Sequence, residues 1–183
     1  MENRKIFGLT GLNASGKSTL GKHLENKGFA FISLSDFLRK ELDNKNIEKT
    51  RDNLINIGNE LRNKHGSGVL GLKAREYINS LDNNFVIDSI RNPSEILELQ
   101  KLENFKLIFV KSDPKVRYDR AIKRNRNENF STFEEFLAKE KLEMSDNKNS
   151  QQLHKCIEMA NITIENNETI DKFIEKIDEL IEN

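Results

Sequence analysis

Short apolar runs alternate along the chain with longer segments in which apolar residues recur every three or four positions. The short runs are rich in Phe, Ile and Val and are bounded by turn residues, a pattern typical of strands buried on both faces of a parallel sheet. We predict strands at Ile6–Thr10, Phe29–Ser33, Phe85–Asp88, Phe105–Val110 and Ile162–Ile164.

The segments between these runs have helical spacing. Leu20 and Leu24 are four positions apart, for example, and so share one face of a helix. The predicted helices are Lys17–Lys27, Ser35–Leu42, Thr50–Lys64, Gly68–Leu81, Pro93–Leu102, Pro114–Arg126, Thr132–Met144, Gln151–Met159 and Glu168–Ile181. Strands that alternate with helices predict an α/β fold, with helices on both faces of a parallel sheet.

The second and third predicted strands are separated by about fifty residues that have helical patterns and no strand-like run, far more than a plain crossover needs. We therefore expect an inserted helical subdomain at residues 36–82. The remainder, residues 1–35 and 83–183, would form the core of a single domain, because a chain of 183 residues fits one domain.

The composition excludes several classes of protein. The chain has 30 Lys and Arg residues against 30 Asp and Glu, and this zero net charge disfavours nucleic-acid binding by bulk positive charge. No apolar run approaches the roughly 20 residues that span a bilayer, and no signal-peptide pattern precedes the first strand. The single cysteine, Cys156, excludes a disulfide within the chain and an all-cysteine zinc site. We therefore expect a cytoplasmic protein without a membrane partner.

The most specific motif is Gly11-Leu12-Asn13-Ala14-Ser15-Gly16-Lys17-Ser18, which matches the P-loop pattern G-x-x-x-x-G-K-[ST] between a predicted strand and a predicted helix. Its glycines let backbone N–H groups turn toward phosphates, and the helix N-terminus adds partial positive charge. Lys17 would reach the β- and γ-phosphates of ATP, and the Ser18 hydroxyl would ligate Mg²⁺. The alternative is a glycine-rich turn without a ligand. We expect ATP to be bound by Gly11, Asn13, Ala14, Ser15, Gly16, Lys17, Ser18 and Thr19.

A P-loop predicts a bound nucleoside triphosphate without defining the reaction. None of the four Asn-Lys pairs is followed two positions later by Asp, so the N-K-x-D motif of GTPases is absent from the sequence. The chain also has no L-S-G-G-Q string of ABC transporters, and it is short for an AAA+ motor with an added helical domain. A small kinase is the leading class.

An acid ends one predicted strand and closely follows another, and each acid is followed three residues later by an arginine. Asp88 ends the third strand and precedes Arg91, and Asp36 follows the second strand and precedes Arg39. The carboxyl ends of parallel strands are where ligands bind in such folds. Asp88 is the form expected for a Mg²⁺-associated acid, and Arg91 could bind a phosphate. Asp36 could orient the attacking group of an acceptor whose anionic end Arg39 holds. Each acid could instead be a helix cap or turn residue.

The zero net charge hides a basic segment at residues 113–130. Arg117, Arg120 and Arg124 recur at i, i+3 and i+7 and therefore share one predicted helix face. A lid that carries such arginines would stabilise the transferring charge and exclude water. The alternative is a solvated basic helix face. In the inserted segment, Arg62 could likewise contact the acceptor or be an exposed helix charge.

The chain resembles the P-loop nucleoside-monophosphate kinases over nearly its whole length. The residues from Ile6 to Ser18 and from Phe31 to Arg39 are similar to those of adenylate-kinase-like enzymes and dephospho-coenzyme A kinases. Other strings resemble a less characterised branch, which includes archaeal kinase-like proteins and the kinase-like domain fused to deoxycytidylate deaminases. These strings are Ile32-Ser33-Leu34-Ser35-Asp36, Gly58-Asn59-Glu60-Leu61-Arg62, Val86-Ile87-Asp88-Ser89-Ile90-Arg91-Asn92-Pro93 and Cys156-Ile157-Glu158-Met159-Ala160.

The resemblance implies a five-stranded parallel sheet in three layers, an acceptor-binding insertion at residues 36–82 and a short lid at about 120–132. It implies ATP and Mg²⁺ as cofactors, with Ser18 and, through water, Asp88 at the metal. The implied catalytic residues are Lys17, Asp36, Asp88, Arg91 and Arg124. The implied acceptor ligands are Asp36, Arg39, Arg62 and Arg91. Further implied ATP ligands are Arg120, Arg124, Arg126 and Asn167, and the resemblance places Asn166 and Asn167 where such folds hold the adenine, largely through backbone.

The sequence departs from these relatives in two places. Ser33-Leu34-Ser35-Asp36 stands where dephospho-coenzyme A kinases usually have Asp-Ala-Asp, and Ser89 and Ile90 stand where adenylate kinases have Gly-Phe-Pro. A deaminase or other nucleotide-metabolism partner would have to be a separate chain, because one cysteine cannot build the deaminase zinc site.

These features support three functions. The first is ATP- and Mg²⁺-dependent phosphoryl transfer to a nucleoside or deoxynucleoside monophosphate, a small-molecule substrate. The second is the same transfer to dephospho-coenzyme A or another small acceptor. The third is a nucleotide-sensing regulatory module that transfers no phosphate.

Overall fold

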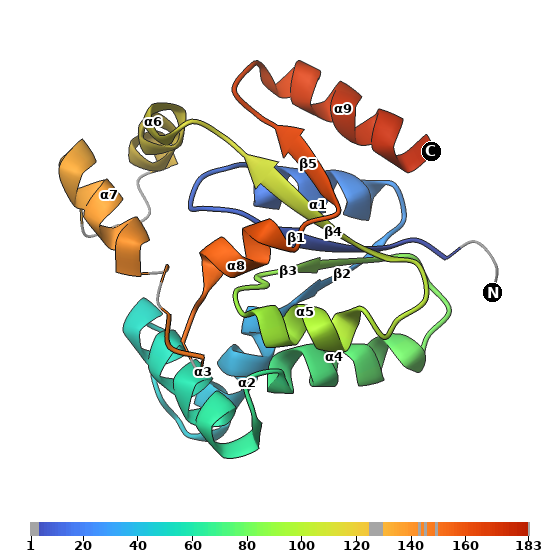
Figure 1. Cartoon of the computed structure of the whole chain (residues 1–183), viewed down its shortest axis with the longest axis vertical. Helices are drawn as coiled ribbons and strands as arrows, with labels where there is room; N and C mark the ends of the chain where they lie inside the picture. Colours follow the sequence, from blue (N-terminus) through green and yellow to red (C-terminus); the bar gives the residue numbers. More distant parts are fainter. Residues whose placement is uncertain (1–3, 125–129, 143, 145, 149, 183) are drawn as a thin grey trace.

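The core is one parallel sheet (Figure 1). The structure is a computed structural model that describes residues 4–124, 130–142, 144, 146–148 and 150–182. Its five strands lie in the order β2-β3-β1-β4-β5 and all pair in parallel. They are β1 at Ile6–Thr10, β2 at Ala30–Ser33, β3 at Phe85–Asp88, β4 at Phe105–Lys111 and β5 at Ile162–Glu165.

The helices fall where the periodicity predicts them, with ends that differ by a few residues. They are α1 at Lys17–Asn26, α2 at Leu34–Asn44, α3 at Arg51–His65, α4 at Val69–Asn79, α5 at Pro93–Leu99, α6 at Pro114–Arg124, α7 at Phe133–Leu142, α8 at Leu153–Glu158 and α9 at Ile170–Glu182. Within the described part of the chain, no helix has both the length and the apolar character that crossing a membrane requires.

Two hydrophobic clusters separate the layers. Ile6 of β1 lies in a cluster with residues of α4, α5 and α8, whereas its neighbour Phe7 lies in a cluster with residues of α1 and α9. Alternate residues of a strand point to opposite faces of the sheet, so the two clusters occupy its two sides. The predicted three-layer α/β arrangement is therefore confirmed.

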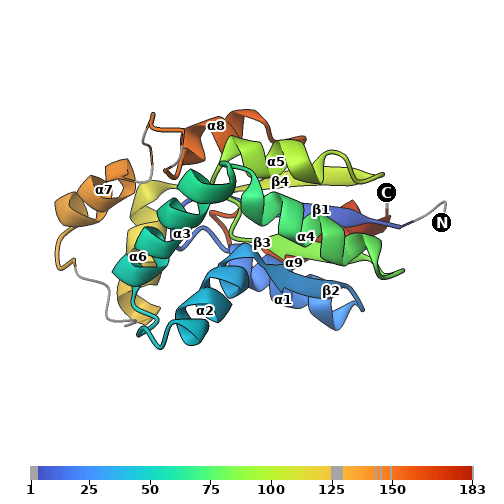
Figure 2. The same ribbon diagram turned by 90° about the horizontal axis from the view of Figure 1, so that it is seen from below.

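The helices α2, α3 and α4 connect β2 to β3, in the segment predicted as a helical insertion. Figures 1 and 2 show α2 and α3 at the same end of the sheet as α6 and α7, and at the opposite end from the last turn of α9. Because β1 to β5 all run toward this end, it holds the loops in which an α/β protein binds its ligands.

The turn from β3 into α5 is held by a reciprocal cap. The Asn92 side chain accepts a hydrogen bond from the Ser94 backbone N–H at 2.9 Å. The Glu95 carboxylate accepts one from the Asn92 backbone N–H at 3.1 Å, which completes a capping box. Pro93 begins the helix with a fixed φ. These bonds satisfy backbone donors that the first turn of a helix leaves unpaired.

The helices α4 and α5 approach closely enough for backbone to touch backbone. Gly71 of α4 is buried against Glu95 of α5, and a Cβ added to Gly71 would lie 2.8 Å from the Glu95 Cα. No side chain can be accommodated at that distance unless the helices separate. The contact therefore places Glu95, and with it the β3–α5 turn, relative to the insertion.

We predict that Gly71→Ala lowers the free energy of unfolding by about 1–3 kcal/mol, the usual effect of overpacking. Chemical denaturation measures this loss. Glu76→Ala, at an exposed position of the same helix, serves as the control and should change stability little. Equal stability of the two variants would contradict the close approach.

Candidate nucleotide-binding site

The loop from β1 to α1 has the backbone geometry of an anion cradle. Gly11 and Gly16 have φ angles of 147° and 112°, and Ala14 between them has a φ of 58°. A Cβ on Gly11 would lie 2.7 Å from the Val110 carbonyl oxygen, so only glycine fits there. Gly16 caps α1 without a side-chain hydrogen bond, which leaves the first N–H groups of the helix directed at a ligand.

Lys17 reaches across the mouth of this loop. Its Nζ donates to the carbonyl oxygens of Gly11 at 2.6 Å and Leu12 at 2.9 Å. The ammonium group is thus held within the loop, where a polyphosphate would meet it. Ser18, the next residue, is exposed at the start of α1.

Asp88 presents a buried carboxylate oxygen next to the P-loop. The pairing of Gly8 with Ile87 puts Asp88 level with the end of β1. Among the described residues, Asp88 Oδ1 and Ser15 Oγ are buried without a hydrogen-bond partner. Buried polar atoms are nearly always paired, so each has capacity for a missing ligand.

These groups fit a bound Mg²⁺. This ion prefers oxygen ligands, keeps several waters and is bound through one or two protein groups plus substrate phosphates. A Ser18 hydroxyl and a water-linked Asp88 meet that description. Within the described part of the chain, no cluster of three or more His, Cys, Asp or Glu residues forms a separate metal site.

Asn166, which follows β5, joins the P-loop to α6. Its Nδ2 donates to the Ser15 carbonyl oxygen at 2.8 Å. Arg120 donates to Asn166 Oδ1 at 3.2 Å and to the Asn166 carbonyl oxygen at 3.0 Å. Burial, with a smaller effect of Arg124, lowers the pKa of Arg120. Asn167, the predicted adenine contact, instead accepts from the Asp113 backbone N–H at 2.8 Å.

Arg117, one of the three arginines predicted to share a face of α6, is buried. Arg117 is only 2% exposed and forms two hydrogen bonds with Glu140 of α7. It also donates to the carbonyl oxygen of Ser112 at 2.9 Å and to that of Asn13 at 3.4 Å. Arg117 therefore links α7 to the P-loop. Arg126 lies outside the described residues.

Arg124 lies beside a cavity of about 450 Å³. The cavity combines the predicted nucleotide ligands Ser18, Thr19 and Arg124 with residues that the sequence did not single out, namely Lys22, His23, Asn26, Ile170 and Ile174. Its size is within the range of small-ligand sites. Three predicted ATP ligands from two distant segments thus meet at one opening.

The predicted acceptor ligands are held by separate contacts. Arg39 pairs with Asp36 at 2.5 Å on the surface, where such a pair stabilises the fold very little. Arg91 donates to Gln151 Oε1 at 3.0 Å. Arg62 is 5% exposed and pairs with the fully buried Glu95 at 2.8 Å. Its guanidinium is thus turned into the core.

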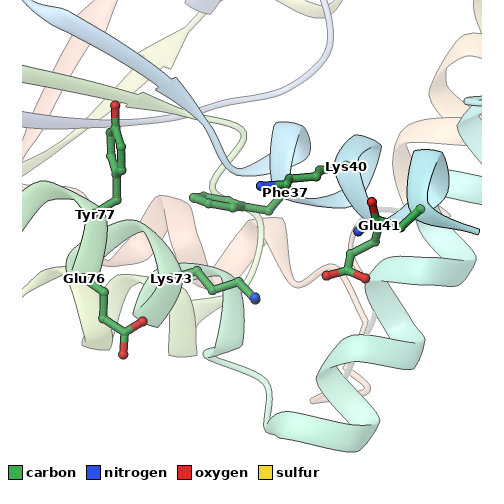
Figure 3. A pocket seen from close by; sticks show the side chains of 7 residues that line it. Phe37, Lys40, Glu41, Lys73, Glu76 and Tyr77 are labelled. Atoms are coloured by element: carbon green, nitrogen blue, oxygen red, sulfur yellow. The ribbon is translucent and has the colours of Figure 1, made fainter.

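A second cavity, of about 360 Å³, lies between α2 and α4. Figure 3 shows Phe37, Lys40 and Glu41 on one side and Lys73, Glu76 and Tyr77 on the other. Two lysines and two glutamates cancel in formal charge, in contrast to the cationic P-loop. None of the predicted site residues lines this cavity.

Glu95 and Glu140 are site residues that were not predicted from the sequence. A signal for Glu95 exists in the Asn92-Pro93-Ser94-Glu95 string, which has the spacing of a capping box. Glu140 carries no such signal, because its partner Arg117 is 23 residues away in the chain.

The fold and the loop geometry define a P-loop kinase-like α/β protein. A family model described as an AAA domain matches residues 8–143. The UPF0200 protein of Sulfurisphaera tokodaii is 33% identical over 179 residues, which cover 97% of this chain and 96% of that protein. The chain belongs to the AAA domain family and, by this likeness, to the UPF0200 proteins.

Solved structures extend the likeness at the level of the fold. TT1252 from Thermus thermophilus has a TM-score of 0.65 and 18% identity, and the match covers 99% of this chain and 98% of that one. A shikimate kinase from Bacteroides thetaiotaomicron has a TM-score of 0.58 and 16% identity, with 98% and 99% covered. The coarse resemblance to P-loop kinases is thereby confirmed, whereas the narrower nucleoside-monophosphate-kinase resemblance stays a prediction.

We predict that Glu140→Ala lowers the free energy of unfolding by about 3–5 kcal/mol, because it leaves the buried Arg117 charge without its carboxylate. Urea denaturation followed by circular dichroism measures the loss. Glu134→Ala, an exposed glutamate of the same helix, is the matched control. If both variants unfold alike, Arg117 does not depend on Glu140.

Proposed function

We propose that this protein transfers the γ-phosphoryl group of ATP to a nucleoside or deoxynucleoside monophosphate in the presence of Mg²⁺. The observation that supports this most strongly is the partnerless Oδ1 of Asp88. It lies beside a P-loop and three residues before an arginine. The proposed acid for the metal, Asp88, and the proposed cation for the acceptor, Arg91, thus lie at the end of β3. This strand pairs with β1, which leads into the P-loop.

The donor side of the site would bind and neutralise the triphosphate. N–H groups of the loop and of the first turn of α1 would hold its oxygens, and Lys17 would leave the carbonyls of Gly11 and Leu12 to pair with them. Arg124, at the rim of the cavity with Ser18 and Thr19, would add positive charge there. Arg120, anchored on Asn166, would act at the β5 side.

Mg²⁺ would be held by Ser18 and, through water, by Asp88, and it would neutralise charge on the phosphates. On the acceptor side, Arg91 and Arg39 would hold the phosphate of the monophosphate. Asp36 would release Arg39 from their surface pair and orient the attacking oxygen. Catalysis of this kind consists mainly of positioning and charge neutralisation.

A second candidate is transfer to a hydroxyl group of a small acceptor such as dephospho-coenzyme A. The exposed pair of Asp36 and Arg39 favours it, because an acid beside a cation suits an acidic substrate with a hydroxyl as well as a monophosphate. The shikimate kinase of similar fold, named for a hydroxyl-bearing acid, gives this candidate further support.

A coupled assay of ADP release across the common ribo- and deoxyribonucleoside monophosphates tests the proposal. We expect one or a few of them to stimulate turnover and to yield a diphosphate. Product analysis separates the two candidates, since transfer to phosphate gives an anhydride and transfer to a hydroxyl gives an ester. Tight ATP binding without turnover stimulated by any monophosphate would contradict the proposal and favour the second candidate or the nucleotide-sensing module.

We predict that Lys17→Ala lowers acceptor-stimulated turnover by about a hundredfold or more, because it removes a preorganised cation from the transferring phosphate. Thermal unfolding should change little, since Lys17 is half-buried and is not part of the hydrophobic core. Lys106→Ala, an exposed lysine at the far end of β4, is the control. Unchanged nucleotide binding and turnover in Lys17→Ala would show that the loop does not hold ATP.

A further inference from the structure

A buried ion pair joins the helical insertion to the turn that carries Arg91. Arg62 of α3 donates to Glu95 Oε1 of α5 at 2.8 Å, with the two side chains 5% and 0% exposed. Gly58, four residues before Arg62 on α3, lies beside the arginine side chain, because a Cβ added to Gly58 would come within 3.1 Å of an Arg62 Nη atom. The absence of a side chain at Gly58 therefore leaves space for Arg62 to turn inward.

The other oxygen of Glu95 holds the backbone of Arg91. Glu95 Oε2 accepts from the backbone N–H groups of Arg91 at 3.0 Å and of Asn92 at 3.1 Å. A single carboxylate thus connects the guanidinium of Arg62 with the main chain of Arg91. If α3 were displaced, the main chain of Arg91 would be displaced too, because charge-assisted hydrogen bonds join Arg62 to Glu95 and Glu95 to the Arg91 backbone N–H.

The chain before α8 holds the same turn from the opposite side. The backbone N–H of Gln152 donates to the Arg91 carbonyl oxygen at 2.8 Å, and the Arg91 side chain donates to Gln151 at 3.0 Å. The Asn92 amide group donates to the carbonyl oxygens of Lys148 at 2.7 Å and Ser150 at 2.9 Å. Hydrogen bonds to other elements thus fix both the backbone of Arg91 and the direction of its side chain.

Stability alone does not account for a buried ion pair at this place. Moving two charges out of water carries a large desolvation penalty, and apolar residues of similar volume often stabilise a core as well or better. The apolar residues Leu38, Ile57 and Leu61 already pack in this cluster. A better explanation for the pair of Arg62 and Glu95 is that it holds the backbone of Arg91, a predicted acceptor ligand, in place.

We propose that Arg62 and Glu95 are positioning residues for Arg91, and that through them the place of α3 determines where the acceptor's anionic group binds. This inference rests on the proposed function, in which Arg91 holds the phosphate of the acceptor. It also changes the role assigned to Arg62 from the sequence, because Arg62 acts through Glu95 and does not touch the acceptor.

The test compares two double variants. Arg62→Met with Glu95→Gln keeps an oxygen at position 95 for the two backbone N–H groups and removes the tie to α3. Arg75→Met with Glu98→Gln is the matched control, because Arg75 and Glu98 also form an ion pair between the insertion and α5, at 3.1 Å, away from the Arg91 turn. Both variants exchange one pair of charges for neutral groups.

We expect the Arg62/Glu95 variant to raise the KM for the monophosphate by about ten- to a hundredfold, as misplacement of a binding group does. The KM for ATP should stay within about twofold, because the P-loop is not part of this network. The Arg75/Glu98 control should leave both constants near wild type. Arg62→Lys, which keeps the charge but not the planar fork, should give an intermediate KM for the monophosphate.

The only cysteine of the chain reports whether a variant has kept its core. Cys156 is fully buried. Burial, with a smaller effect of the nearby Glu95 carboxylate, raises the pKa of its thiol to about 12. Slow labelling of Cys156 by a thiol reagent therefore shows that a variant has kept its core. A raised KM with wild-type labelling separates positioning from loss of fold.

The outcomes distinguish the inference from the function on which it rests. If wild-type protein turns over monophosphates but the Arg62/Glu95 variant keeps the wild-type KM, only the inference is overturned. The same holds if the control variant shows an equal rise. If the wild-type protein turns over no monophosphate, the proposed function fails and the inference fails with it.

Discussion

A loop that binds phosphate through its backbone must direct several N–H groups at one point. The P-loop meets this requirement by leaving β1 through residues with positive φ and entering α1 without a side-chain cap. Such a loop has to stand at the centre of the sheet for other groups to reach it. The order β2-β3-β1-β4-β5 provides this, with β3 and its Asp88 on one side and β4, which leads to Ser112 and α6, on the other.

Two buried arginines hold the helices α7 and α3 to this centre. On the β4 side, Arg117 connects Glu140 of α7 with the carbonyl oxygen of Asn13 in the P-loop. On the β3 side, Arg62 connects α3 with the Arg91 turn through Glu95. Arg117 uses several donors of its planar guanidinium to bond with Ser112, Asn13 and Glu140, whereas Arg62 bonds with Glu95 and reaches the Arg91 turn through that carboxylate. Buried charges of this kind contribute geometry more than they contribute stability.

Much of the architecture follows from local pattern. The strands and helices lie within a few residues of their predicted bounds, because each buried strand is a short apolar run between turn residues and each helix carries an apolar stripe. The P-loop is equally local, since its glycines and lysine are adjacent in the chain. The basic segment shows the limit of such reasoning. A helical repeat predicts that Arg117, Arg120 and Arg124 share a face, but not which of them is buried.

The fold class, the positions of the strands in the chain and the phosphate loop can be predicted without a structure, because they depend on neighbouring residues. The roles of Arg62, Glu95 and Glu140 are visible only in the folded chain. A charged side chain on a helix can face solvent, a ligand or an ion-pair partner, and the choice depends on which distant residue packs against it. Arg62 meets Glu95 across 33 positions and Arg117 meets Glu140 across 23. The zero net charge is likewise a sum over groups whose pairing only the folded chain determines.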